Sequence, residues 1–509
     1  KNMYDIIVFN GGIVMLFDYD FKDPESIYRY ALYLRGKTFK EIFEEYLRSP
    51  KKSYFDQPTY PLKVKEDKYV YLDSSKGQLG NFLEKYYFGY DPNGRAEADF
   101  KEAGIELKQT PVDKGKKGEL RAGERLSITN ISYEEPVIED FYESHVWEKI
   151  HRILLVQYLR DKAKNRLDYE ILFVNLFTPP KEDLEIIKQD YYTIIEKVKA
   201  GKAQDLSEGD TTYLGACTKG SNAEKSWRRQ FYPDHALAKK RNFCLKQSYM
   251  NYVLREYVLK DKVPYEPIIK DIQALREKGF DELITEKIDR YVGLTDKELC
   301  QRFSREYNNN KAQWSDLAYR MLDIKSNHAE EFVKAGIKVK TVRIEQNGKI
   351  KESWPLPPIV FKDLINEDWE HSELYRALET EKYLFVVFKY NGTSYTLLGS
   401  QLWNMPQKDI EDKVRPGWEK IKRIVQEGVD FIPKIEKSGK VTYANNLPKK
   451  SENEVIHIRP HAPKAAYRFF DGTVIGDLKH ADELPDGQMM TKQSFWINND
   501  YLLSQLKFK

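Results

Sequence analysis

The sequence predicts a mixed α/β fold that is present twice, as two related lobes in tandem. Residues 139–160 and 182–199 carry apolar side chains at the spacing of amphipathic helices. Residues 105–109 and 127–131 instead alternate apolar and polar side chains, as half-buried strands do. Four short segments also recur in the same order in the two halves of the chain, which predicts a duplicated fold.

The recurring segments define the expected domain boundaries. They pair 36–42 with 293–299, 99–108 with 331–340, 139–144 with 367–372, and 246–249 with 492–495. Pro264 and Pro267 lie between the two copies, where prolines favour a connecting loop. We therefore expect an N-terminal leader at 1–19, a first lobe at 20–262, a linker at 263–270 and a second lobe at 271–509.

The composition excludes several classes of protein. The 509 residues include 83 Lys and Arg against 80 Asp and Glu, so any affinity for nucleic acid must come from local clusters of charge. The three cysteines lack CxxC spacing, which argues against a disulfide framework or a structural zinc site. The chain contains no GxxxxGK[ST] loop, and its longest apolar stretch, 6–17, is too short to span a membrane. We expect a cytoplasmic protein that uses no ATP and has no membrane partner.

Asp99, Glu106 and Lys108 form the pattern that indicates chemistry. Alternation along the strand at 105–109 places Glu106 and Lys108 on one face, and Asp99 precedes them across a turn that contains Gly104. Two carboxylates beside an ammonium suit metal-dependent cleavage of a phosphodiester: the carboxylates hold Mg²⁺, and the lysine orients or deprotonates water or stabilises charge. The same spacing also fits a surface cluster of ion pairs, and spacing alone leaves both interpretations open.

The pattern Asp-x6-Glu-x-Lys, within the segment at 99–112, resembles the MutH family of mismatch-repair nucleases. The resemblance is closest to the two-lobed restriction-enzyme branch typified by Sau3AI. It implies a bacterial enzyme whose lobes have the PD-(D/E)xK restriction-endonuclease-like fold, a mixed sheet flanked by helices. The segment at 76–84 resembles the family's segment before the catalytic strands, which implies a metal-site role for Glu84 and a DNA contact for Lys76. The segment at 144–149 resembles the family motif S-H-V-x-x-K, which implies a catalytic role for Lys149.

Two further segments resemble the region with which the family reads bases. Residues 213–220 match the segment that enters the major groove, which implies a DNA contact for Lys219, although a surface lysine is the alternative. Residues 241–249 match the neighbouring strand-to-helix segment, which implies a DNA contact for Lys246. Cys217 and Cys244 depart from the family, where an arginine and a methylation-sensing tyrosine stand, so a response to adenine methylation is not implied.

The second lobe resembles the same fold with its catalytic residues replaced. Lysines at 338 and 340 would repel Mg²⁺, whereas Arg459-Pro460 keeps the family's base-reading pattern. We therefore expect this lobe to bind DNA without cutting it, with contacts from Arg459, His461 and Lys492. The replacements are Glu331 for Asp99, Lys338 for Glu106, Tyr319 for Glu84 and Ala377 for Lys149.

Other basic and histidine residues allow more than one interpretation. The segment at 219–246 is rich in Lys and Arg with aromatic residues between them, which favours phosphate contacts by Arg228 and Arg229, or a solvated loop. Glu124 is a candidate for base recognition by its position alone. The i, i+4 pair of His457 and His461 could suggest metal ligation on a helix, but alternation and Pro460 favour a strand and loop.

These observations together predict a type II restriction endonuclease that needs Mg²⁺ and no ATP. The resemblance implies double-stranded DNA as substrate, GATC as the recognition sequence and cleavage on the 5′ side of the G. It also implies a cognate DNA methyltransferase in the same system and action as a monomer or a DNA-induced dimer. A mismatch-repair nicking enzyme and a DNA-binding regulator without cleavage activity are the alternatives.

Overall fold

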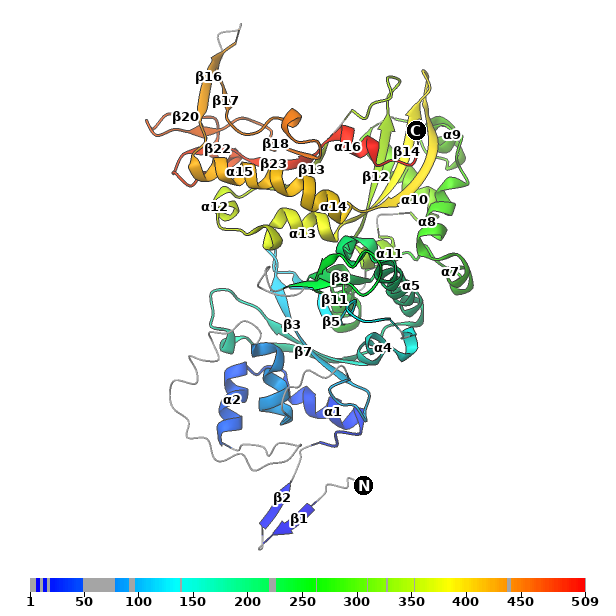
Figure 1. The fold of residues 1–509 in the computed structure, drawn as a ribbon, viewed down its shortest axis with the longest axis vertical. Helices are drawn as coiled ribbons and strands as arrows, with labels where there is room; N and C mark the ends of the chain where they lie inside the picture. The colour runs from blue at the N-terminus through cyan, green and yellow to red at the C-terminus, as the bar shows by residue number, and fades with distance from the viewer. Residues whose placement is uncertain are drawn as a thin grey trace. The chain divides into compact units, whose positions relative to one another are not determined.

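The computed structural model divides the chain into two compact units (Figure 1). Unit 1 is residues 1–201 with 212–264, and unit 2 is residues 202–211 with 265–509. The division after residue 264 lies inside the segment expected as linker, but the sequence does not predict that 202–211 groups with unit 2. The described residues are 6–9, 12–15, 19–48, 78–90, 97–137, 140–218, 226–261, 263–308, 310–325, 328–351, 353–436 and 441–508.

Unit 1 contains a four-stranded mixed sheet and a three-stranded antiparallel sheet. In the first sheet the strand order is β4-β3-β6-β7, and β3 and β6 are parallel; in the second the order is β5-β11-β8. The strands are β3 (Glu106–Lys114), β4 (Leu120–Ala122), β5 (Leu126–Asn130), β6 (Ile153–Leu159), β7 (Ile171–Phe177), β8 (Leu214–Thr218) and β11 (Arg241–Leu245). Two antiparallel ribbons complete the unit: β1 (Ile6–Phe9) with β2 (Gly12–Met15), and β9 (Trp227–Arg229) with β10 (Leu237–Lys239).

Helices cover these sheets and an aromatic core holds one edge of unit 1 together. The helices are α1 (Pro24–Ala31), α2 (Phe39–Arg48), α4 (His145–Ile150), α5 (Lys181–Lys199) and α6 (Gln247–Val253). Phe39 and Phe43 of α2 pack against Phe82, and Phe88 packs against Phe100. These rings are buried, and they hold the helical segment Glu84–Phe88 in the same core as Leu107 at the start of β3.

The secondary structure confirms most of the expected elements and corrects one. Helix α5 and strands β3 and β5 lie where the sequence predicts a helix and two strands. The expected helix at 139–160 is wrong beyond Ile150, because β6 begins at Ile153. The side chains of Ile153 to Val156 are all fully buried, and a continuous apolar run of this kind is typical of a central strand covered on both faces.

Unit 2 has the same two kinds of sheet. Its mixed sheet has the order β12-β14-β15, with β12 and β14 parallel, and its antiparallel sheet has the order β13-β23-β18. These strands are β12 (Ile337–Ile344), β13 (Trp354–Pro358), β14 (Lys382–Tyr390), β15 (Tyr395–Trp403), β18 (Ile456–Pro460) and β23 (Gln493–Ile497). A projecting ribbon and a small sheet add β16 (Phe431–Ile435), β17 (Val441–Asn445), β19 (Tyr467–Arg468), β20 (Val474–Ile475), β21 (Ala481–Glu483) and β22 (Met489–Thr491) (Figure 1).

The helices of unit 2 surround a core that joins both of its main sheets. They are α7 (Ile272–Lys278), α8 (Phe280–Asp289), α9 (Asp296–Arg302), α10 (Lys311–Met321), α11 (Glu330–Ala335), α12 (Phe361–Leu364), α13 (Glu373–Thr380), α14 (Gln407–Asp409), α15 (Arg415–Glu427) and α16 (Asn499–Ser504). No helix in the described part of the chain has the length and apolar character needed to cross a membrane.

Three of the four recurring segments occupy matching places in the two units. Thr38 and Thr295 each bond reciprocally with a glutamate three residues later, Glu41 and Glu298, at the start of a helix. A glycine with positive φ, Gly104 or Gly336, precedes the strands β3 and β12. Ser144 and Ser372 cap the helices α4 and α13 with equivalent hydrogen bonds. The antiparallel partners β6–β7 and β14–β15 also both contain a register shift.

The fourth pair of segments, 246–249 and 492–495, is not equivalent. Residues 246–249 follow β11 and begin α6, whereas residues 492–495 lie at the start of β23. The counterpart of Tyr249 is instead Tyr501, because each is the third residue of its helix and donates its hydroxyl to an aspartate, Asp183 at 2.9 Å or Asp409 at 2.7 Å. Strand pairing sets the alignment here, and a four-residue match in sequence is too short to reveal it.

Candidate active site

Asp99 and Glu106 lie side by side because a tight turn folds the chain back before β3. Phe100 and Ile105 exchange backbone hydrogen bonds of 2.9 and 3.2 Å, and Gly104 at the end of this turn has φ +63°, a conformation that favours glycine. The backbone N–H of Leu107 donates to Asp99 Oδ2 at 2.9 Å, and the N–H of Asp99 donates to Glu106 Oε2 at 3.3 Å. The local backbone therefore orients both carboxylates.

Glu106 is buried between two lysines. Its side chain is 2% exposed, and Lys149 Nζ donates to both carboxylate oxygens, at 2.9 and 3.0 Å. Lys108 Nζ lies 2.7 Å from Glu106 Oε1, and the Lys108 side chain is 20% exposed. This burial excludes the surface ion-pair cluster that the spacing of these residues also fits, because a surface cluster would leave the carboxylate in water.

Helix α4 positions Lys149 and supports the segment that carries Asp99. Ser144 Oγ accepts a hydrogen bond from the Trp147 N–H and so begins the helix. Lys149, near the other end, is buried against Glu106. The neighbouring Glu148 accepts a hydrogen bond of 3.2 Å from the backbone N–H of Ala98. Sequence reasoning missed Glu148, although its place next to Lys149 is a signal that could have identified it.

Glu84 and Asp99 have strongly perturbed acidities. Burial, with the charges of Asp99 and Glu106, raises the pKa of Glu84 to about 8. Burial and the charge of Glu106 likewise raise the pKa of Asp99 to about 6, although Lys108 and the Leu107 N–H act in the opposite direction. The structure thus brings all five residues expected to be catalytic, Glu84, Asp99, Glu106, Lys108 and Lys149, into one electrostatically coupled cluster. Crowded carboxyl groups of this kind are characteristic of functional sites.

A divalent cation fits the chemistry of this donor set. Among the described residues, no three Asp, Glu, His or Cys side chains are already gathered in positions to hold a metal ion. Asp99 and Glu106 nevertheless supply the oxygen ligands that Mg²⁺ prefers, and protein-bound Mg²⁺ commonly has one or two carboxylate ligands and several waters. Burial and then repulsion between the carboxylates raise the pKa values of Glu84 and Asp99, and a positive charge placed between them would relieve that repulsion.

Tyr90 is a second residue that sequence reasoning missed. Its hydroxyl is buried and has no hydrogen-bond partner within the described structure. Burial and the charge of Asp99 hold its pKa well above the usual range, so the hydroxyl keeps its proton. A protonated, unpartnered hydroxyl near Asp99 can donate to an oxygen of a bound group. Tyrosine is common enough in this chain, with 35 residues, that no sequence signal separates Tyr90 from the rest.

The segment of unit 2 that recurs from 99–108 carries no matching carboxylate cluster among its described residues. Lys338 pairs with Glu381, and both oxygens of Glu331 accept backbone hydrogen bonds of 2.9 Å, from Ile268 and Ile269. Ala377 lies five residues after the capping Ser372, as Lys149 lies five residues after Ser144. Glu331, Lys338 and Ala377 therefore lie at the positions expected from the sequence, relative to Gly336 and Ser372.

The residues expected to contact DNA in unit 1 are only partly described. Lys76 and Lys219 lie outside the described residues. Arg228 and Arg229 lie in the ribbon β9–β10, where Arg228 Nε is 3.6 Å from Glu134 Oε2 and Trp227 is exposed. Glu124 is exposed and lies 3.8 Å from Arg160. These positions leave the ribbon accessible to a phosphate backbone.

The expectation that Lys246 contacts DNA needs correction. Its side chain is only 2% exposed, and its charge acts on the fully buried carboxylate of Asp190. Asp190 in turn accepts hydrogen bonds from three successive backbone N–H groups, those of Thr212, Tyr213 and Leu214, at 2.6 to 2.9 Å. Lys246 therefore compensates a buried carboxylate that anchors the start of β8, and this interior position removes it from any DNA surface.

Arg459 is held in a defined position on unit 2. Its guanidinium lies 3.7 Å from the ring centre of Trp496, and its side chain remains exposed. His461 Nδ1 is 2.7 Å from Ser494 Oγ in β23, and the exposed Lys492 immediately precedes that strand. His457 lies within β18 and pairs with Asn498, so the expectation of a strand rather than a helical metal pair is confirmed.

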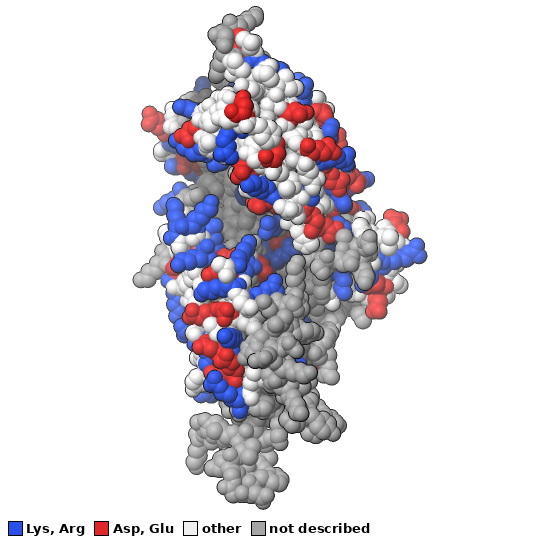
Figure 2. All heavy atoms as spheres, turned by 90° about the vertical axis from the view of Figure 1, so that its left-hand side faces the viewer, with Lys and Arg blue, Asp and Glu red and all other residues white. Residues whose placement is uncertain are grey.

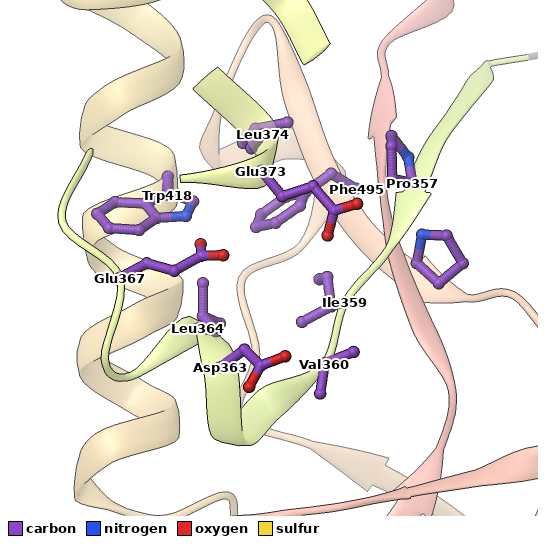
Figure 3. Close-up of a pocket in the computed structure, with 11 residues that line it drawn as sticks. Pro357, Ile359, Val360, Asp363, Leu364, Glu367, Glu373, Leu374, Trp418 and Phe495 are labelled. Carbon is purple, nitrogen blue, oxygen red and sulfur yellow. The ribbon is translucent and has the colours of Figure 1, made fainter. Parts of the chain in front are cut away.

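Neither the charge on the face in Figure 2 nor the small cavity in Figure 3 indicates a small-molecule site. Basic side chains form several separate groups with acidic ones between them on the face in Figure 2, so no single basic surface dominates that face. A cavity of about 30 Å³ in unit 2 is lined by Trp418, Phe495 and Leu374 with Glu367 and Glu373 (Figure 3). This volume suits one or two water molecules and excludes a nucleotide.

Comparisons with known proteins identify the family of the chain. The family described as DNA mismatch repair enzyme MutH matches residues 88–190, a range that contains Asp99, Glu106, Lys108 and Lys149. The chain is 34% identical over 470 residues to the type II restriction enzyme Sau3AI of Staphylococcus aureus, an alignment that covers 86% of this chain and 93% of that protein. It is 28% identical over 156 residues to the DNA mismatch repair protein MutH of Shewanella woodyi, which covers 30% of this chain and 64% of that protein. The chain therefore belongs to the family of endonucleases that contains Sau3AI and MutH.

Proposed function

We propose that the chain is a type II restriction endonuclease that hydrolyses duplex DNA with Mg²⁺ and without ATP. The observation that carries this proposal is the buried Glu106, which is held by Lys149 and Lys108 next to Asp99. A binding protein gains nothing from a buried, crowded group of carboxylates, because DNA is itself an anion. A nuclease needs such a group to hold a cation against the phosphate.

Each residue of the cluster has a separate role in the proposed reaction. Asp99 and Glu106, with Glu84, would hold Mg²⁺, which supplies an activated water and neutralises charge on the phosphate. Lys149 fixes the orientation of Glu106 through its two hydrogen bonds. Lys108 is the more exposed of the two lysines, so it can turn from Glu106 toward the attacking water or the charge that develops on phosphate oxygen. The unpartnered hydroxyl of Tyr90 can donate a hydrogen bond to an oxygen of the bound phosphate.

We further propose that unit 1 has the PD-(D/E)xK fold and that unit 2 is a duplicated copy which binds DNA without cutting it. The shared strand orders, helix caps and register shifts support the duplication. The replacement of the carboxylates in unit 2 supports the loss of cleavage. The exposed, stacked Arg459 supports retained DNA binding, since arginine can read guanine with two hydrogen bonds.

The proposed recognition sequence is GATC, with cleavage on the 5′ side of the G. This part rests on the relation to Sau3AI and on the segment that contains Lys219. A bacterial cell that makes such an enzyme in its cytoplasm must protect its own DNA, so we also propose a cognate DNA methyltransferase as functional partner. The proposed active form is a monomer or a dimer that assembles on DNA.

Cleavage of a sequenced plasmid tests the proposal. Purified full-length protein with Mg²⁺ should cut both strands at GATC and leave 5′ GATC ends, and EDTA should abolish cutting while added ATP changes nothing. The matched control is the Asp99→Asn variant, which keeps the shape of the side chain but not its charge. Nicks in one strand only would favour the mismatch-repair alternative, and binding without any cleavage would favour the regulator.

A further inference from the structure

Two lysines stand in unit 2 where unit 1 carries a catalytic glutamate and lysine. Lys338 and Lys340 lie on one face of β12, and β12 follows Gly336 as β3 follows Gly104. Both strands pair in parallel with the strand that follows a serine-capped helix. Lys338 therefore occupies the position of Glu106, and Lys340 occupies the position of Lys108.

The surroundings of these lysines leave positive charge without a full counterion. Glu381 forms an ion pair with Lys338 and also accepts a hydrogen bond from Tyr383. Within the described part of the chain, Lys340 Nζ has no ion pair, and it lies 5.6 Å from the ring centre of Trp354. The group formed by Lys338, Lys340 and Glu381 thus has a net charge of one positive unit.

Lys340 is also partly withdrawn from water. Burial, together with the charge of Lys338, lowers its pKa, although the charge of Glu381 acts in the opposite direction. Its side chain passes beside Trp354, which packs on Phe385 with ring centres 5.0 Å apart. A half-buried ammonium next to another ammonium costs free energy unless an anion approaches. Lys340 lies on the face of β12 that corresponds to the face of β3 with Glu106 and Lys108. In the proposed reaction, that face of β3 meets the phosphate.

We propose that Lys338 and Lys340 form a phosphate-binding site in unit 2 that needs no metal ion. In unit 1 the carboxylates require a cation between themselves and a phosphate, whereas in unit 2 the ammonium groups contact the phosphate directly. The ligand is a phosphodiester group of duplex DNA, and this identification rests on the proposed function. Hydrolysis does not follow, because Glu331 is used by backbone N–H groups and Ala377 replaces Lys149.

Binding in the absence of metal separates this site from the catalytic one. Full-length protein and a fluorescent duplex are titrated in EDTA, where no cleavage occurs, at several salt concentrations. The double variant Lys338→Gln/Lys340→Gln should bind about tenfold more weakly or worse, since a hydrogen bond to a charged group contributes about 1.5 kcal/mol or more. The slope of log affinity against log salt should also become shallower by roughly 0.9 for each phosphate that the variant no longer neutralises.

Two further variants keep the result interpretable. Lys389→Gln is the matched control, because Lys389 is exposed and lies at the opposite end of the same sheet, where it pairs with Ile344. The variant Lys338→Arg/Lys340→Arg keeps both charges and should bind nearly as wild type does. Thermal unfolding first checks that the double glutamine variant and the Lys389→Gln control are both folded. If the two folded variants then bind the duplex with the same affinity and the same salt slope, the proposal is overturned.

A second set of measurements distinguishes DNA from free phosphate as the ligand. It also separates a failure of this inference from a failure of the proposed function. Inorganic phosphate in EDTA should raise the unfolding temperature of the wild type only slightly, and less than the duplex does. If phosphate protects the wild type and the double variant loses only that protection while duplex binding is unchanged, the identification of the ligand as DNA is overturned. If the wild type cleaves plasmid and the glutamine variants bind as it does, only this inference fails. If the wild type neither binds nor cleaves, the proposed function fails first.

Discussion

Replacing Lys149 with methionine tests the central contact of the proposed active site. Methionine keeps the length and apolar stem of the side chain and removes the ammonium that donates to both oxygens of Glu106. The two side chains are 9% and 2% exposed, so the carboxylate loses a partner that water cannot replace. The change therefore acts on a buried ion pair and on the orientation of a proposed metal ligand at once.

The expected magnitudes follow from these contacts. Removing one partner of a buried ion pair destabilises proteins by about 3–5 kcal/mol. We expect the lower end, about 3 kcal/mol, because Lys108 Nζ stays 2.7 Å from Glu106 Oε1 and keeps part of the compensation. Cleavage should fall by about 100-fold or more, since a displacement of about 1 Å at a reacting group has effects of this order.

Urea unfolding in EDTA and single-turnover cleavage with enzyme in excess measure the two effects separately. Lys116→Met is the control, because Lys116 is exposed in the loop between β3 and β4. The double variant Glu106→Gln/Lys149→Met should regain most of the lost stability, since no buried charge is left without a partner, and should still fail to cut. If Lys149→Met unfolds and cuts as Lys116→Met does, the assignment of this cluster as the active site is wrong.

Three further predictions concern the metal ligands, their acidity and the second unit. Asp99→Ala or Glu106→Ala should abolish cleavage while affinity for duplex DNA in EDTA stays within a few fold, and cleavage within tenfold of wild type in either variant would contradict the metal site. Folding raises the pKa of Glu84 from 4.5 to about 8 and that of Asp99 from 3.8 to about 6, so the metal-free folded protein holds extra protons between these values. The free energy of unfolding of the metal-free protein should therefore fall as the pH rises from 4 to 8. Mg²⁺ should raise the unfolding temperature more at pH 8 than at pH 6, because bound Mg²⁺ must displace those protons. An equal effect of Mg²⁺ at both pH values would refute this. Arg459→Ala should weaken specific binding about ten- to a hundredfold, since a bidentate arginine contributes about 1–3 kcal/mol per base, and should slow cleavage of one-site plasmids; a second duplex in trans should then help the variant less than the wild type.

The recurring segments show where a comparison of short sequence matches agrees with the structure and where it does not. The matches of 99–108 and 139–144 agree with the structure because both copies of the first keep a positive-φ glycine before a strand and both copies of the second keep a serine that caps a helix. The match of 246–249 with 492–495 is wrong because the pairing of β11 and β23 with their neighbours sets that register. Lys246 is misassigned for a related reason: its burial against Asp190 depends on a helix distant in sequence.

The sequence by itself determined that three residues of the candidate active site come together. Asp99, Glu106 and Lys108 lie within one turn and one strand, so alternation and Gly104 suffice to place them together. Only the tertiary structure decided that Glu106 is buried, because that burial depends on Lys149 from helix α4 and on the aromatic core behind Glu84. Contacts between residues close in sequence follow from backbone geometry, whereas burial and the acidity of a carboxylate follow from which distant elements pack around it.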